Sequence, residues 1–169
     1  MPEFIKCYVR WVDTFNRRVG LIAMYLIFAM FGILFYSSIS KAFHLPANWT
    51  LESAQFTMAA YYMLGGAFAM QTGDHVRMDL FYGEWSHRRR AAFDIVTAIA
   101  LIVFLGFMLY GGISSTTYAI QFKEKSFTAW APYMAPIKII MTFGVLMMLA
   151  QSFSALFKDF AALTGRPIE

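Results

Sequence analysis

Long uncharged stretches alternate with short polar segments along the whole chain. Residues 19–40, 53–73 and 95–122 contain no charged side chain, and residues 136–157 contain only Lys138. Each stretch is long enough to cross a membrane, because about 20 helical residues span the apolar core of a bilayer. The pattern predicts an all-α membrane protein, a single domain over residues 1–169, with four transmembrane helices at 19–41, 52–73, 90–122 and 134–158.

The segment before the first span mixes apolar and basic positions. Its apolar residues recur at helical spacing, three or four residues apart, while Lys6, Arg10, Asp13 and Arg17 lie mostly on the other side. This pattern predicts an amphipathic interfacial helix over residues 1–18. A plain cytosolic tail is the alternative. The apolar positions are Phe4, Tyr8, Trp11, Val12 and Phe15.

The largest polar segment, residues 73–94, separates the second span from the third. Residues 76–87 are expected to form a short helix on the membrane surface, an elbow that fixes the angle between the two spans. Three arginines, Arg88, Arg89 and Arg90, follow at the start of the third span, where they oppose the helix dipole. Anionic lipid headgroups would offset that cost, so anionic lipid is an expected partner.

The distribution of basic residues predicts the topology. Ten of the 14 Lys and Arg residues lie in the N-terminal segment, in residues 73–94 or after the last span, and four lie in or near the two intervening loops. Because basic residues favour the cytoplasmic side, both termini are predicted to be cytoplasmic. The net charge of +4 then reflects topology, and no nucleic-acid partner is expected.

Composition supports a membrane protein and excludes several functions. The chain is 59% hydrophobic and 14% charged, against about 25% charged in soluble domains. Cys7 is the single cysteine, which excludes paired-cysteine redox chemistry. The histidines lie outside the spans, no span has an acid near its centre, and no nucleophile stands beside a base. We therefore expect neither an enzyme nor a protein with its own cofactor or metal.

The spans contain a few residues that suit helix packing or helix ends. Gly65 and Gly66 lie in the second span, where Gly65 and Ala69 make a small-residue step that lets another helix approach. Glu52 stands at the start of that span, where a carboxylate stabilises the helix dipole. Lys138 lies near one end of the last span, and its side chain can reach the membrane surface.

One motif resembles a known family. The Gly- and Ala-rich second span runs into the sequence His75-Val76-Arg77-Met78-Asp79. This arrangement is similar to the small membrane subunit of TRAP transporters, the tripartite ATP-independent periplasmic transporters (DctQ-like family). Glu52 also matches a family position. The segment from Trp130 to Lys138, with Gly144 and Gln151 beyond it, resembles a branch described as mannitol/chloroaromatic or 2-oxo-acid type.

The resemblance implies a bacterial inner-membrane subunit that works with two partners. A large membrane subunit would hold the organic acid and sodium and move by an elevator mechanism, and a periplasmic binding protein would deliver the substrate. The small subunit would pack on the static scaffold of the large one and help to dock the binding protein. A free-standing membrane scaffold or assembly protein is the alternative.

The resemblance also assigns roles to residues. The expected subunit-interface or structural residues are Glu52, Gly65, Gly66, His75, Arg77 and Asp79. The expected docking residues for the binding protein are Lys41, Lys123, Lys125, Trp130 and Lys138.

Overall fold

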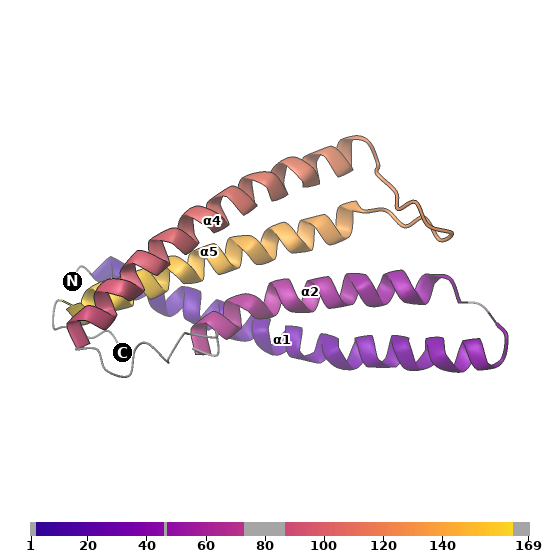
Figure 1. The fold of residues 1–169 in the computed structure, drawn as a ribbon, viewed down its shortest axis with the longest axis horizontal. Helices are drawn as coiled ribbons and strands as arrows, with labels where there is room; N and C mark the ends of the chain where they lie inside the picture. The colour runs from indigo at the N-terminus through magenta and orange to yellow at the C-terminus, as the bar shows by residue number, and fades with distance from the viewer. Residues whose placement is uncertain (1–2, 46, 73–86, 164–169) are drawn as a thin grey trace.

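The computed structural model describes residues 3–45, 47–72 and 87–163, which form four long α-helices (Figure 1). The helices are α1 (Glu3–Ala42), α2 (Trp49–Thr72), α4 (His87–Gln121) and α5 (Ala135–Leu163). Within these ranges β-structure is limited to one isolated bridge, between Lys125 and Tyr133. The predicted all-α class is confirmed, whereas the predicted surface helix at 76–87 lies almost wholly outside the described residues.

Three of the described helices are long and apolar enough to cross a membrane. They are α1, the part of α4 over Ile95–Gln121, and the part of α5 over Ala135–Lys158. The 24-residue α2 is long enough but carries more polar side chains, among them Glu52, Gln55 and Gln71. The predicted number of four spans is therefore supported for three helices, and the crossing by α2 stays a prediction.

The N-terminal segment is continuous with the first span. Helix α1 runs without interruption for 40 residues, so a separate interfacial helix over residues 1–18 is not confirmed. No proline or turn sequence separates the segment from the span, and Val9, Val12 and Asn16 are buried in the protein. Tertiary contacts along the first turns thus hold this segment as the beginning of α1.

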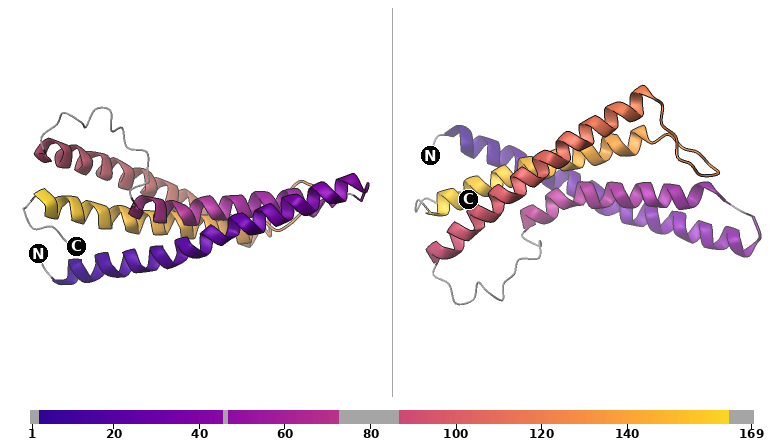
Figure 2. Two further views of the ribbon diagram at one scale, coloured as in Figure 1. Left: turned by 90° about the horizontal axis from the view of Figure 1, so that it is seen from below. Right: turned by 45° about the horizontal axis from the view of Figure 1, so that its top comes forward.

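The helices form two hairpins that diverge at one end. Helix α1 packs along α2 and α4 along α5, while α5 also packs on α2 and on α1. In Figure 1 the hairpins separate toward the ends of α1 and α4, hereafter the loop end, whereas α1 begins and α5 ends at the opposite end, hereafter the terminal end. The right view of Figure 2 shows the two hairpins crossing between these ends. Helix α5 therefore joins the two hairpins.

Small residues allow the helices to approach closely at two positions. A Cβ atom placed on Gly144 of α5 would lie 2.8–2.9 Å from the Cβ and backbone of Met63 on α2. One placed on Gly20 of α1 would lie 2.5 Å from Phe68, also on α2. Distances this short leave no room for a side chain, so α2 packs on both neighbours through glycine.

Helices α1 and α4 both end at the loop end, and they end with the same backbone geometry. His44 and Lys123 both have positive φ angles, 57° and 48°. In each case the next residue donates its N–H five residues back, from Leu45 to Ser40 and from Glu124 to Ala119. This is the Schellman motif, in which the left-handed residue is usually glycine. Lys123 therefore helps to end α4, in addition to being exposed.

Candidate functional site

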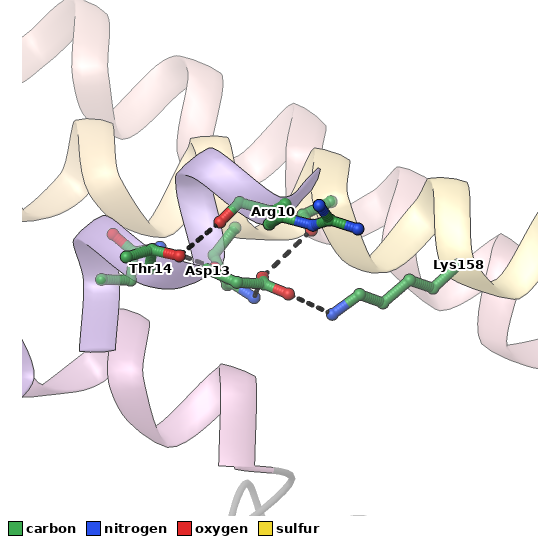
Figure 3. A network of polar contacts seen from close by, with 7 residues as sticks. Arg10, Asp13, Thr14 and Lys158 are labelled. Atoms are coloured by element: carbon green, nitrogen blue, oxygen red, sulfur yellow. Dashed lines mark hydrogen bonds and ion pairs between the residues drawn. The ribbon is translucent and has the colours of Figure 1, made fainter. Parts of the chain in front are cut away.

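A polar network at the terminal end joins α1 to α5, and Figure 3 shows part of it. Asp13 Oδ2 forms an ion pair with Lys158 Nζ at 2.6 Å. Asp13 Oδ1 accepts hydrogen bonds from Gln151 Nε2 at 3.0 Å and from Ser154 Oγ at 3.3 Å. Asn16 Nδ2 donates to Gln151 Oε1 at 2.6 Å. All the partners of Asp13 and Asn16 in this network come from α5.

The network is largely withdrawn from solvent. Asn16, Gln151 and Ser154 are each at most 2% exposed. Nearby, the Tyr8 hydroxyl donates to the Ala150 carbonyl at 3.3 Å, and the Tyr8 ring meets Phe157 edge to face. Because buried polar groups are costly unless they are hydrogen-bonded, these contacts fix the register of α1 against α5.

Sequence reasoning placed Asp13 on the polar face of a surface helix and did not identify this network. Helical spacing shows that Asp13, Asn16 and Arg17 share a side of α1, but not that α5 covers part of it. The sequence did contain one indication of this network. The last span carries the polar residues Gln151, Ser152 and Ser154 near its C-terminal end, which lies at the same side of the membrane as Asp13 in the predicted topology. Polar side chains inside a span are expected to bond to another helix.

The predicted docking residues lie at the ends of both hairpins. Lys41 is exposed at the end of α1, and Lys123, Lys125 and Trp130 are exposed in the 122–134 loop. Backbone hydrogen bonds from Ser126 to Pro132 and from Met134 to Glu124 close this loop. Lys125 Nζ lies 4.9 Å from the centre of the Tyr133 ring. The structure thus gathers three of these residues in one ordered loop and sets Lys41 on the other hairpin.

Lys138 is bound within the chain. Its Nζ pairs with Glu124 Oε2 at 2.5 Å, and its backbone carbonyl accepts a hydrogen bond from Thr142. The lysine therefore has a carboxylate partner at the loop end, a pairing that the sequence analysis did not predict. The pair ties the start of α5 to the end of α4.

The predicted interface residues of α2 differ in their surroundings. Glu52 is 7% exposed, and its Oε2 is buried without a hydrogen-bond partner among the described residues. A Cβ on Gly66 would lie 3.0 Å from the sulfur of Met148, whereas a Cβ on Gly65 would meet no atom within 4 Å. Gly66 thus packs inside the chain and Gly65 faces open space. His75, Arg77 and Asp79 lie outside the described residues, as do the side chains of Arg88, Arg89 and Arg90.

An apolar cleft of about 520 Å³ opens between the hairpins. It is lined by Phe104, Phe107 and Gly111 of α4, by Met141 and Val145 of α5, and by Met63 of α2. Phe107 is 75% exposed, and only 6% of the most apolar window of α4 is buried. Helix α4 therefore presents most of its apolar side chains away from its own chain.

No group of three or more His, Cys, Asp or Glu side chains suited to a metal occurs within the described residues. The longest-range polar contacts join α1 to α5 through Asp13 and Asn16, α4 to α5 through Thr116 and Thr142, and the 122–134 loop to α5 through Glu124 and Lys138. Their arrangement serves to hold α1 and α5, and α4 and α5, in register.

Comparison with known proteins identifies the family. Residues 30–162 match the model of the family described as "Tripartite ATP-independent periplasmic transporters, DctQ component". The search of curated proteins and the search of solved structures returned no match. The matched residues include α2, α4 and nearly all of α5, with both loop-end connections. The chain therefore belongs to the DctQ component family of the tripartite ATP-independent periplasmic transporters.

Proposed function

We propose that this small TRAP transporter subunit is a static packing partner of the large membrane subunit in a sodium-coupled uptake system for organic acids. The observation that carries the proposal is the apolar cleft between the hairpins, which the chain leaves open. In a membrane such a surface is covered either by lipid chains or by another helix, and we propose that a helix of the large subunit fills it.

The open face of α2 supports the same assignment. Gly65 has no neighbouring atom within 4 Å of a Cβ position, although small residues in membrane helices usually mark close helix contacts. We propose that Gly65 contacts the large subunit, while Gly66 serves internal packing. The substrate, of carboxylate or 2-oxo-acid type, and the sodium ions are assigned to the large subunit. The bonding of Asp13 to α5, and of Lys138 to Glu124 in the 122–134 loop, favours a structural role for these charged groups.

The alternative function is a free-standing membrane scaffold, and purification distinguishes the two. The tagged chain is purified from its native membrane in mild detergent, and the associated proteins are identified by mass spectrometry. We expect a stoichiometric polytopic membrane protein, together with reduced recovery of it from the Gly65→Leu variant. Recovery of the chain alone, stable and monodisperse, would favour the free-standing scaffold.

The proposed orientation places the terminal end in the cytoplasm of a bacterial cell. Cys7 is exposed and is the chain's single cysteine, which makes it a natural probe. In intact cells Cys7 should react with a membrane-permeant maleimide and not with an impermeant one. A Cys7→Ser variant that carries Phe127→Cys, at a fully exposed loop position, should show labelling by both reagents. Labelling of Cys7 by the impermeant reagent would show that the terminal end faces the periplasm, the reverse of the proposed orientation.

We propose that the 122–134 loop helps to dock the periplasmic binding protein. Lys123, Lys125 and Trp130 are exposed together there, and charge complementarity mainly raises association rates. Replacing Lys125 by Glu should slow association of the binding protein with the membrane complex at low salt. Lys41→Glu tests whether the docking surface extends to the other hairpin, and Arg18→Glu, at an exposed position near the opposite end of the chain, is the control. Equal association rates for the wild-type and Lys125→Glu complexes would exclude a docking role for Lys125.

A further inference from the structure

A second cleft, polar in character, lies at the terminal end. Its volume is about 250 Å³, and its lining comes from three helices. Lys6, Arg10 and Arg17 belong to α1, Gln71 to α2 and Lys158 to α5. The cleft therefore forms only when α1, α2 and α5 are packed together, at a place distinct from the apolar cleft.

The cleft carries an excess of positive charge. Four of its lining residues are Lys or Arg, and Asp13 is the one acid among them. Asp13 is already engaged by Lys158, Gln151 and Ser154. Lys6, Arg10 and Arg17 are exposed, and none forms an ion pair with a described residue. Among the described residues, the cleft thus has three cations without an ion-pair partner around the Asp13–Lys158 pair.

The polar network positions these cations. Residues 6, 10 and 17 lie on one side of α1 because their spacings, four and seven residues, correspond to about one and two helical turns. Figure 3 shows Arg10 and Lys158 extending from α1 and α5 on two sides of Asp13. The bonds of Asp13 to α5 hold this side of α1 against α5 and keep the cleft between them.

The depth of the cleft matches the level of lipid phosphates. Arg17 comes two residues before the uncharged stretch that begins at Val19, and Lys158 directly follows the last apolar span. Both residues therefore lie at the boundary between the apolar core and the headgroup layer. A phosphodiester at that level carries one negative charge, opposite in sign to the three cations, and a guanidinium group can bind two phosphate oxygens at once.

We propose that this cleft binds the phosphodiester headgroup of one anionic phospholipid, such as phosphatidylglycerol, from the leaflet that surrounds the terminal end. With the proposed topology this is the inner leaflet. The bound lipid would bridge α1 and α5 and reinforce the joint between the hairpins. Gln71 adds an uncharged polar side chain, whose Oε1 is buried and has no hydrogen-bond partner among the described residues.

Native mass spectrometry of the purified full-length chain tests this site. The chain is titrated in detergent with phosphatidylglycerol or with phosphatidylcholine of the same acyl chains. One phosphatidylglycerol should be retained in preference to phosphatidylcholine. Each removed cation should weaken retention by about fivefold, so that the Arg10→Gln/Arg17→Gln variant shows a loss of more than tenfold. Arg18→Gln, an exposed neighbour that does not line the cleft, should retain the lipid.

Two outcomes would overturn the proposal. Equal phosphatidylglycerol retention by the double variant and by Arg18→Gln would show that the lipid binds elsewhere or by diffuse charge alone. Displacement of the lipid by millimolar inorganic phosphate would assign the cleft to a soluble anion. The assay needs neither the large subunit nor a known orientation, so its result is independent of the copurification and labelling experiments. Size-exclusion profiles identical to that of the wild type establish that the variants are folded.

Discussion

Replacing Gly144 by Leu is expected to separate α5 from α2 and to lower the stability of the chain by about 3 kcal/mol, the upper part of the usual range for overpacking. A Cβ at this position would already lie 2.9 Å from the Met63 backbone, which cannot rotate away as a side chain can. Because α5 joins the two hairpins, the resulting strain would act on the helix that holds them together. The denaturation temperature of the purified chain in mild detergent measures the effect.

Gly111 on α4 provides the matched control. A Cβ placed there meets no atom within 4 Å, so Gly111→Leu should leave the isolated chain as stable as the wild type or slightly more stable. Leucine favours a helix over glycine by about 0.8 kcal/mol, and this gain is common to both variants. Equal denaturation temperatures for the two variants would contradict the close approach of α2 and α5.

Replacing Asp13 by Leu is expected to cost about 2–3 kcal/mol and to loosen α1 from α5. The variant removes the acceptor for Gln151 and Ser154, both almost fully buried, and leaves the Lys158 ammonium without its carboxylate. The ion pair itself contributes modestly, because the side chains of Lys158 and Asp13 are 36% and 20% exposed. Most of the loss therefore comes from the two unsatisfied hydrogen-bond donors.

Two further variants separate these contributions. Lys158→Met removes only the ion pair and should cost less than about 1 kcal/mol. Asp13→Leu combined with Ser154→Ala should recover part of the stability lost in the single Asp13 variant, because the Ser154 hydroxyl, whose acceptor is Asp13 Oδ1, is no longer left unsatisfied. If the losses of the two single variants simply add, Asp13 and Ser154 are not coupled as the structure places them.

The helices could be predicted from the sequence because uncharged length is a strong signal in a membrane protein. The predicted spans at 52–73, 90–122 and 134–158 lie close to α2, α4 and α5. A boundary between two helices was predicted at residue 18, and the continuity of α1 through this position could not be predicted. The basic residues up to Arg18 mark where the apolar core begins, and helical backbone geometry continues through that boundary without any local change.

The pairings of polar side chains could not be derived either. Periodicity gives the face of a helix that holds Asp13 but not the helix that covers it. In the same way, Lys138 was assigned to the membrane surface or to docking, although Glu124 lies near it across the loop. The distinction between Gly65 and Gly66 also depends on packing, since only the position of Met148 shows which glycine is covered. The family resemblance from His75 to Asp79 was confirmed by the family match over 30–162.

Photo-cross-linking from the apolar cleft is the most direct test that a large membrane subunit packs between the hairpins. A photoreactive amino acid is placed at Phe107, which lines the cleft, or at Phe28 on α1, which is 68% exposed and lies outside it. After irradiation in native membranes, the Phe107 position should form an adduct with one polytopic membrane protein, and the Phe28 position should yield mainly lipid adducts. Lipid adducts alone from both positions would contradict the proposed packing.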